Sequence, residues 1–423
     1  MLKTFFRKVG IVVRDRALTR KLGFILLAFA AFRLLAAIPV PGADASMLAS
    51  FFADSQIFAV LNLFSGGGLS ALSVVALGVG PYITASIILQ LATMMFPRLK
   101  EMYHEEGQTG RRKFAQYSRI ATVPLAAIQG LALIKLLESQ NVLPPLQGAD
   151  LALSVLAMVA GSVLLMWIGE LISEFGAGNG VSVLIFAGIV AGLPSSLSQL
   201  EFAYDPSQLP SYLGFGAIAL IAIAGVVAVT EAERPIPIAH ARQVFGGKSS
   251  APTFLPIRVN QAGVMPVIFA LSLLIVPQLA AQYLPSRPEA WLAQIGSFAS
   301  QFMANQLYYG IAYFLLVVLF TFFYTAVTFE PDTLAKNLQR QGAFVPGVRP
   351  GEATAEHIGK IVARTTTIGA LFLGVIAVLP LVGQYATGIQ AVTVGGTSLL
   401  IVVNVVTDLI KKFDGQITMR EYR

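Results

Sequence analysis

The sequence predicts an all-α polytopic membrane protein whose ten transmembrane helices form two five-helix inverted-repeat halves. Three observations lead to this prediction. Hydrophobic residues make up 56% of the 423 residues and charged residues only 12%, with a mean hydropathy of +0.73. An ordinary soluble chain carries roughly 25% charged residues, so this chain has too few charges to cover a water-exposed surface. Ten apolar windows are long enough for helices that cross about 30 Å of hydrocarbon, and they lack the alternating pattern of barrel strands.

The ten apolar windows divide the chain evenly. Residues 1–200 form an N-terminal half with five predicted spans, and residues 201–423 form a C-terminal half with the other five. An odd number of spans in each half reverses the orientation of the second half, as an inverted repeat requires. The predicted spans are Leu22–Val40, Val74–Phe96, Ser118–Glu138, Leu151–Ile172, Val181–Leu200, Tyr212–Glu231, Gly263–Leu284, Leu307–Phe329, Thr365–Val382 and Ile389–Ile410.

Lysine and arginine predict the orientation of these spans. If the spans alternate from a cytoplasmic N-terminus, 26 of the 29 Lys and Arg residues fall on the cytoplasmic side. The exceptions are Arg33 within a span, Lys135 near a span end, and Arg287 on the outer side. The positive-inside rule therefore predicts that both termini are cytoplasmic.

A nearly uncharged stretch covers residues 57–96. It is too long for one helix, yet it leaves no proper loop between two. The run SGGGLS at residues 65–70 interrupts it, and Gly78 and Pro81 follow. We therefore expect a re-entrant helix at about 57–72. Such backbone is tolerated in a membrane only when it is buried in protein or lines a cavity, so the segment suggests a pore.

Enzyme chemistry is not expected. The chain has no cysteine, which excludes disulfides, thiolate metal sites and cysteine nucleophiles. His104, His240 and His357 are far apart, and their spacing does not indicate a metal site. The chain has no HExxH, GxSxG or Walker motif. We expect no catalytic residue, no metal and no cofactor.

Few charges lie inside the predicted spans. Arg33 is interpreted as a packing partner for a neighbouring helix end, and Glu170 and Glu174 are expected at an interface rather than in a proton relay. Membrane transporters of ions or protons usually place charges within their spans. The bare interior therefore argues against a secondary transporter of small solutes, which is the main alternative function.

Two predicted cytoplasmic connections, about 232–262 and 330–364, are long for a helical bundle. Both are basic and rich in Gly and Pro, and residues 342–352 (GAFVPGVRPGE) have strong turn chemistry around Arg349. Two interpretations stand side by side. The loops either only set the topology, or they form a docking surface for an acidic partner or RNA.

Seven sequence runs, spread over nearly the whole chain, point to a family. They are RLLAAIPVPG (33–42), LNLFSGGGLSALSVVALGVGPYITASIILQLA (61–92), GNGVSVLIFAGIVAGLP (178–194), EAERPIPI (231–238), VNQAGVMPVIFA (259–270), GAFVPGVRPGEAT (342–354) and GGTSLLIVV (395–403). In this order they resemble the SecY family, whose members are the main subunit of the protein-conducting channel. The resemblance implies a clamshell of two five-helix halves hinged between spans five and six, in agreement with the span count.

The resemblance implies a pore closed by a ring of apolar side chains. An apolar constriction can block water and ions by dewetting, while branched side chains move aside for a passing chain. Two pairs in the implied ring are spaced i, i+4, so each pair stacks on one helix face. The ring residues are Val79, Ile83, Ile185, Ile189, Ile268 and Ile401.

A plug and a lateral gate are also implied. Glycines suit a plug that sits outside the ring and leaves when a substrate enters, because they weaken a helix and allow close packing. The gate would lie between spans two and three on one side and seven and eight on the other. Interhelical hydrogen bonds in membranes are worth only about 0.6–2 kcal/mol, so a gate closed by a few of them can open. The plug residues are Phe64, Ser65, Gly66, Gly67, Gly68 and Leu69, and the polar gate positions are Thr84, Gln90 and Ser272.

The implied function is passive. The channel lets unfolded polypeptides cross and lets apolar helices leave sideways into the lipid bilayer. The implied partners are SecE, SecG, the SecA motor, the ribosome, and secretory and membrane proteins with signal sequences. Arg349 would support the motor, and Arg242, Lys248 and Arg258 would contact ribosomal RNA. The motifs look bacterial, which implies a bacterial plasma (inner) membrane.

Overall fold

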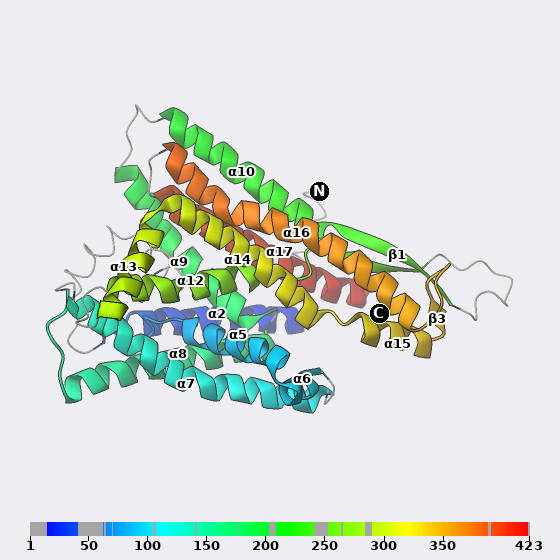
Figure 1. Ribbon diagram of the computed structural model, residues 1–423, viewed down its shortest axis with the longest axis horizontal. Helices are drawn as coiled ribbons and strands as arrows, with labels where there is room; N and C mark the ends of the chain where they lie inside the picture. The colour runs from blue at the N-terminus through cyan, green and yellow to red at the C-terminus, as the bar shows by residue number, and fades with distance from the viewer. Residues whose placement is uncertain are drawn as a thin grey trace.

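The computed structural model describes residues 15–40, 62, 65–69, 71–104, 107–139, 142–176, 178–202, 209–240, 253–263, 265–283, 290–387 and 391–421. In these ranges the chain is mainly helical. Most of the long helices run side by side along the long axis of the molecule, and the strands lie toward one end (Figure 1).

Each of the ten predicted spans falls on a helix. The first half contains α2 (Arg16–Ala36), α5 (Gly80–Met95), α6 (Pro97–His104), α7 (Gly107–Ser139), α8 (Ala149–Phe175) and α9 (Gly180–Phe202). The second half contains α10 (Leu209–Glu231), α12 (Met265–Tyr283), α13 (Ala290–Ala304), α14 (Gln306–Thr328), α15 (Pro331–Arg340), α16 (Glu352–Thr387) and α17 (Ala391–Glu421). Helices α6, α13 and α15 lie outside the predicted spans.

Length and hydropathy qualify four of the described helices to cross a membrane on their own: α7, α8, α16 and the helix that begins at Gln306. A fifth follows if α5 and α6, which meet at an angle of 115°, form one span. The described apolar stretches of α9, α10 and α12 are shorter. The confirmed part of the fold prediction is therefore its all-helical character, and ten crossings stay a prediction.

Local chemistry explains several helix ends. The side chain of Asp15 accepts hydrogen bonds from the backbone N–H groups of Ala17 and Leu18 at the start of α2, and Asn305 caps α14 in the same way. These oxygens satisfy N–H groups that have no partner within the helix. Helix α5 stops at Phe96, because the residue before a proline is disfavoured in the helical region.

The helices pack mainly within their own half. In the first half α7 contacts α5 and α8, and in the second half α16 contacts α14 and α17. Among the described elements, two seams carry the main contacts between the halves. Helix α9 contacts α17 along one seam, and α12 contacts α5 and α7 along the other.

The predicted re-entrant helix at 57–72 stays a prediction, because Asn62 is helical but the described residues from 65 onward are not. Residues 65–69 and 71–79 form consecutive turns, and α5 begins only at Gly80 rather than at Val74. The turns follow from the sequence, because Gly66, Gly67 and Gly78 have positive φ angles of 66°, 83° and 58°. The rest of that segment lies outside the described residues, apart from Asn62.

The two long basic connections are joined in one small domain rather than forming separate loops. Strand β1 (Glu233–His240) pairs antiparallel with β2 (Thr253–Arg258) and with β3 (Ala343–Phe344), so the first connection supplies two strands and the second supplies one. Buried residues of the three strands form one apolar cluster with residues of α15, of α16 and of the loop between β3 and α16. The cluster contains Ile236, Ile238, Ile257, Leu338, Ala343, Val345, Ile358 and Val362.

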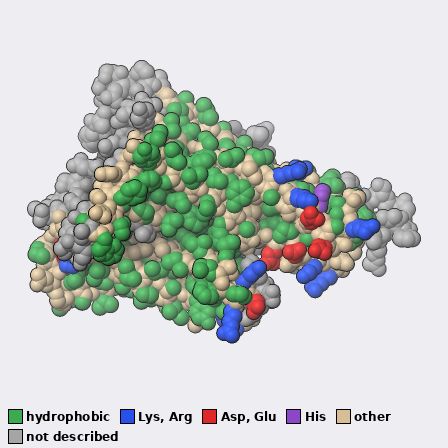
Figure 2. Space-filling view, viewed as in Figure 1, with side chains coloured by type: hydrophobic (Ala, Val, Ile, Leu, Met, Phe, Trp, Pro, Cys, Tyr) green, Lys and Arg blue, Asp and Glu red, His purple; other side chains and the backbone are tan. Residues whose placement is uncertain are grey.

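Charge is distributed along the long axis. Hydrophobic side chains cover most of the face in Figure 2, and nearly all its charged side chains gather toward the end where Figure 1 places α6, α15 and β3. A hydrogen bond of 3.0 Å from Lys21 Nζ to Gln416 Oε1 joins the first turns of α2 to the last turns of α17. Segments that were predicted to be cytoplasmic thus meet at one end, and their sidedness stays a prediction.

A close approach between α8 and the turns before α5 depends on Gly161. A Cβ atom at this position would overlap the backbone carbonyl group of Val74, with its carbon 2.6 Å away. The absence of a side chain therefore lets α8 support these turns directly.

We expect Gly161→Ala to lower the free energy of unfolding by about 1–3 kcal/mol, because the added methyl group displaces backbone. The measurement is the thermal midpoint of the purified protein in detergent. Gly23→Ala is the matched control, since Gly23 is exposed on α2 and a Cβ there meets nothing within 4 Å. Equal midpoints for Gly161→Ala and the parent would contradict the close packing.

Candidate functional site

All six predicted ring residues lie in one buried apolar cluster. Val79 caps α5 and Ile83 follows in its first turn, Ile185 and Ile189 lie on α9, Ile268 lies on α12, and Ile401 lies on α17. Each is at most 4% exposed. The six ring residues therefore come from two helices of each half, which are helices that form the two seams, and the cluster around them also includes residues of α2, α8, α10, α14 and α16.

The turn 65–69 is held together by its own hydrogen bonds. The hydroxyl of Ser65 donates to the carbonyl of Asn62 at 3.0 Å and accepts from the backbone N–H of Leu69 at 2.9 Å. Ser65 and Leu69 are each 1% exposed. Of the predicted plug residues, Ser65, Gly66, Gly68 and Leu69 are buried and Gly67 is half-buried. This agrees with the rule that irregular backbone in a membrane lies within protein or lines a cavity. Phe64 lies outside the described residues.

The neighbours of this turn place it beside the ring. A Cβ built on Gly66 would overlap the ring of Phe32 on α2 and would lie 3.2 Å from the Cα of Gly188 on α9. Gly188 directly precedes the ring residue Ile189. Leu69 packs instead in a second cluster with residues of α7 and α8, including Ile134 and Met158.

The structure gives Arg33 a backbone carbonyl of the 65–69 turn as its partner. Arg33 lies in the last turn of α2, and its Nη1 donates a hydrogen bond of 3.0 Å to the carbonyl of Gly66. Glu170 fits its expected interface position, because Arg119 Nε lies 2.7 Å from Glu170 Oε1 and links α7 to α8. The signal for Arg33 was present in the sequence, since an arginine in an apolar helix requires a partner.

The predicted gate positions lie on the helices that form the second seam, but two of them do not bridge it. The hydroxyl of Thr84 donates to the carbonyl of Gly80, and that of Ser272 donates to the carbonyl of Ile268, each on its own helix. Hydroxyl groups in helices often bond to the carbonyl four residues earlier. Among the described residues, Gln90 Oε1 is buried without a hydrogen-bond partner. Interhelical hydrogen bonds from these two hydroxyls therefore do not close the seam in this structure.

Arg349 projects from a turn at the start of α16. Glycines at 347 and 351 have φ angles of 83° and 100°, which allow the chain to reverse on both sides of Arg349. The hydroxyl of Thr354 donates to the Arg349 carbonyl at 2.7 Å and orders the turn. The Arg349 side chain itself is exposed. A fixed backbone with an exposed guanidinium suits recognition of an acidic group.

The remaining predicted docking residues differ from Arg349. Arg258 lies opposite Glu233 in the β1–β2 pair, and its Nε is 3.5 Å from Glu233 Oε1, so part of its charge is balanced. Arg242 and Lys248 lie outside the described residues. On α16 the Lys360 ammonium group, 2.7 Å from Glu356, lowers the pKa of that carboxyl through a hydrogen bond and its charge.

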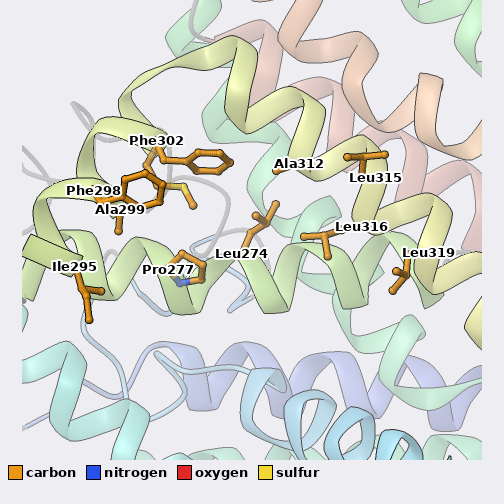
Figure 3. Close-up of a pocket in the computed structure, with 11 residues that line it drawn as sticks. Leu274, Pro277, Ile295, Phe298, Ala299, Phe302, Ala312, Leu315, Leu316 and Leu319 are labelled. Carbon is orange, nitrogen blue, oxygen red and sulfur yellow. The ribbon is translucent and has the colours of Figure 1, made fainter.

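A separate cavity of about 550 Å³ lies between α12, α13 and α14 (Figure 3). Side chains such as Leu274 of α12, Phe298 of α13 and Leu316 of α14 line it, and no ring residue does. The lining is apolar and supplies no polar group to orient a ligand. Within the described part of the chain, no three His, Asp or Glu residues gather as a metal site.

Comparisons with known proteins agree with the motifs. The SecY family model matches residues 73–410. The protein translocase subunit SecY of Mycobacterium tuberculosis is 39% identical over an alignment 452 positions long, gaps included, which covers 100% of this chain and 99% of the relative. The protein translocase subunit SecY of Thermus thermophilus is also 39% identical, with coverage of 100% and 97%.

Solved structures share the fold. A structure described as that of a protein conducting channel matches with a TM-score of 0.67 at 19% identity and covers 93% of this chain and 91% of its own. Sec61 in a canine ribosome-channel complex matches with a TM-score of 0.63 at 18% identity and the same coverage. The family match and the full-length identity therefore establish that this chain belongs to the SecY family of protein translocase subunits, which are channel components and not enzymes.

Proposed function

We propose that this chain is the central channel subunit of a Sec translocon. It conducts unfolded polypeptides passively across the membrane and releases hydrophobic helices sideways into lipid. The observation that carries the proposal is the burial of six apolar ring residues, supplied by two helices of each half, in one cluster. A constriction of this kind excludes water and ions without any charged or moving part.

In this proposal the two halves move apart when the channel opens. Contacts across the α9–α17 seam and across the α5/α7–α12 seam hold the halves together in the closed channel. The second seam is the lateral gate. Since Thr84 and Ser272 bond within their own helices, apolar packing keeps the gate closed, and a hydrophobic segment of a substrate can replace that packing.

The 65–69 turn is the described part of the plug. Its support comes from its position between α2 and α9, next to the ring, and from a backbone built of turns rather than of helix. Turns held by a few hydrogen bonds reorganise at low cost compared with a packed helix. The plug therefore leaves the ring when a polypeptide enters and returns afterwards.

Partners supply the energy, because a channel without catalytic residues cannot. The small sheet and the Arg349 turn form the docking domain for the SecA motor or the ribosome, and SecE and SecG complete the membrane complex. Solved structures with the same fold are described in complexes with the canine ribosome and the yeast 80S ribosome, which supports the ribosome as a partner. The bacterial relatives support the plasma membrane as the location. The distribution of Lys and Arg supports cytoplasmic termini.

Site-specific crosslinking tests the channel proposal directly. Photoreactive residues at Ile83 and at Ile268 are introduced separately into the complete complex, which is reconstituted with its motor and a secretory chain stalled in transit. We expect both positions to crosslink to the chain. Ile88, which is 50% exposed on the same helix as Ile83, is the control and should label lipid instead. A stalled chain that crosslinks elsewhere but at neither ring position would show that the ring is misassigned.

Replacing a ring residue by a polar one should open a path for ions. We expect Ile83→Asn or Ile401→Asn to raise ion leak through the reconstituted channel at least about fivefold, because an amide retains water where branched alkyl groups exclude it. Both variants should also relax the requirement for a signal sequence. Ile88→Asn makes the same chemical change on the lipid-facing side of α5 and should leave the leak unchanged. Equal leak in all three variants and the parent would argue against the ring.

Reversing the charge at Arg349 should uncouple the motor. We expect Arg349→Glu to reduce motor-driven translocation at least about tenfold, since one exposed guanidinium is replaced by a group that repels an acidic partner. Membrane insertion and subunit assembly should stay at parental levels. Arg340→Glu, at the exposed end of α15, is the matched charge reversal. Loss of assembly in Arg349→Glu would instead identify a structural role for the turn.

A further inference from the structure

Two consecutive residues at the end of α2 hold Gly66 from two directions. Arg33 Nη1 donates a hydrogen bond of 3.0 Å to the Gly66 carbonyl oxygen, and the Phe32 ring fills the space where a Gly66 side chain would be. The guanidinium group also lies over Gly67, where a Cβ would be 3.5 Å from Nη1. One turn of one helix thus fixes both the position and the orientation of the 65–69 turn.

The chemistry of this contact makes it reversible. Gly66 is buried, so its carbonyl needs a donor, and Arg33 supplies one. Arg33 is exposed, so breaking the contact does not leave its charge buried inside the protein. A carboxylate partner would bind the guanidinium more strongly than a neutral carbonyl does. The contact is therefore strong enough to select one position of the turn and weak enough to break.

We propose that Arg33 is the latch of the plug, a positioning residue whose hydrogen bond to Gly66 holds the 65–69 turn beside the ring in the closed channel. This inference rests on the proposed function, since it takes the turn to be the plug. The bond breaks when a polypeptide displaces the turn and forms again when the chain has passed. Closed and open states then differ by one charge-assisted hydrogen bond together with the apolar contacts of Phe32 and Leu69.

The test measures how often the turn leaves its position. The chain contains no cysteine, so a single Leu69→Cys substitution provides one thiol, at a position that is 1% exposed. In the complete reconstituted complex without substrate, a water-soluble maleimide labels this thiol only when the turn opens. In the limit of fast reclosing, the labelling rate reports the open population.

We expect Arg33→Met to raise the labelling rate of Leu69→Cys about 5- to 30-fold, because it removes every donor while keeping an unbranched side chain. Arg33→Lys keeps a charge and a donor, and its rate should lie between those of the parent and Arg33→Met. Gly66→Ala should also raise the rate, since its methyl group overlaps Phe32 and its φ of 66° disfavours alanine. Because Arg33 and Gly66 act in one contact, the double variant should open less than the product of the single effects predicts.

A second reporter separates plug opening from general loosening. Leu373→Cys on α16 is also 1% exposed and lies far from the turn along the chain. Arg33→Met should leave its labelling unchanged. An unchanged rate at Leu69→Cys in Arg33→Met, or equal increases at Leu69→Cys and Leu373→Cys, would overturn the latch.

The result also distinguishes the latch from the channel proposal. Labelling of Leu69→Cys needs no substrate and no motor, so it can succeed or fail independently of polypeptide transport. If ring crosslinks form and Arg33→Met leaves Leu69→Cys protected, the channel stands and the latch is wrong. If Arg33→Met raises the labelling of Leu69→Cys but neither ring position crosslinks to a stalled chain, the latch proposal is supported and the channel proposal fails.

Discussion

In hydrocarbon, every backbone N–H and C=O group must find its partner within the protein, and the rest of this structure depends on that constraint. Helices meet it along each span. The turns at 65–69 and 71–79 are an exception among the described residues, and each of their backbone N–H and C=O groups needs its own partner. The Ser65 hydroxyl donates to the Asn62 carbonyl and accepts from the Leu69 N–H, and the Arg33 guanidinium donates to the Gly66 carbonyl. The chain after α2 pairs with Leu72 and Ser73 through a hydrogen bond and an isolated bridge. Irregular backbone at this place is thus possible only because α2, α8 and α9 surround it.

The same constraint explains why polar groups contribute little to the seam beside α12. A hydroxyl in a helix can bond to its own carbonyls, and Thr84 and Ser272 do so. What remains between the helices is apolar packing, which also forms the ring cluster. Hydrocarbon is as apolar as these side chains, so separating the halves costs packing contacts rather than a large hydrophobic penalty. The interface between the halves is closed but can open, because packing against side chains and packing against lipid differ little in free energy.

At the charged end the physical situation is different, because water is available to satisfy backbone groups. The two long connections could have stayed solvated loops, yet they bury a common apolar cluster that includes residues of all three strands. This burial fixes the base of the Arg349 turn on α16 while its side chain stays exposed. A rigid base and an exposed cation on the same domain are the features that a docking surface needs.

Composition and hydropathy by themselves determined that the chain is an all-helical membrane protein, because the hydrocarbon requirement acts on each span locally. The motif order identified the SecY family in the same way, residue by residue. Only the tertiary structure decided which segments meet. It gave turns at 65–69 and 71–72, within the segment 57–72 where a helix was expected, joined two distant loops into one sheet, and gave Arg33 a backbone carbonyl as its partner. Such contacts depend on residues that are far apart in the chain, and helical periodicity carries information only about neighbours a few residues away.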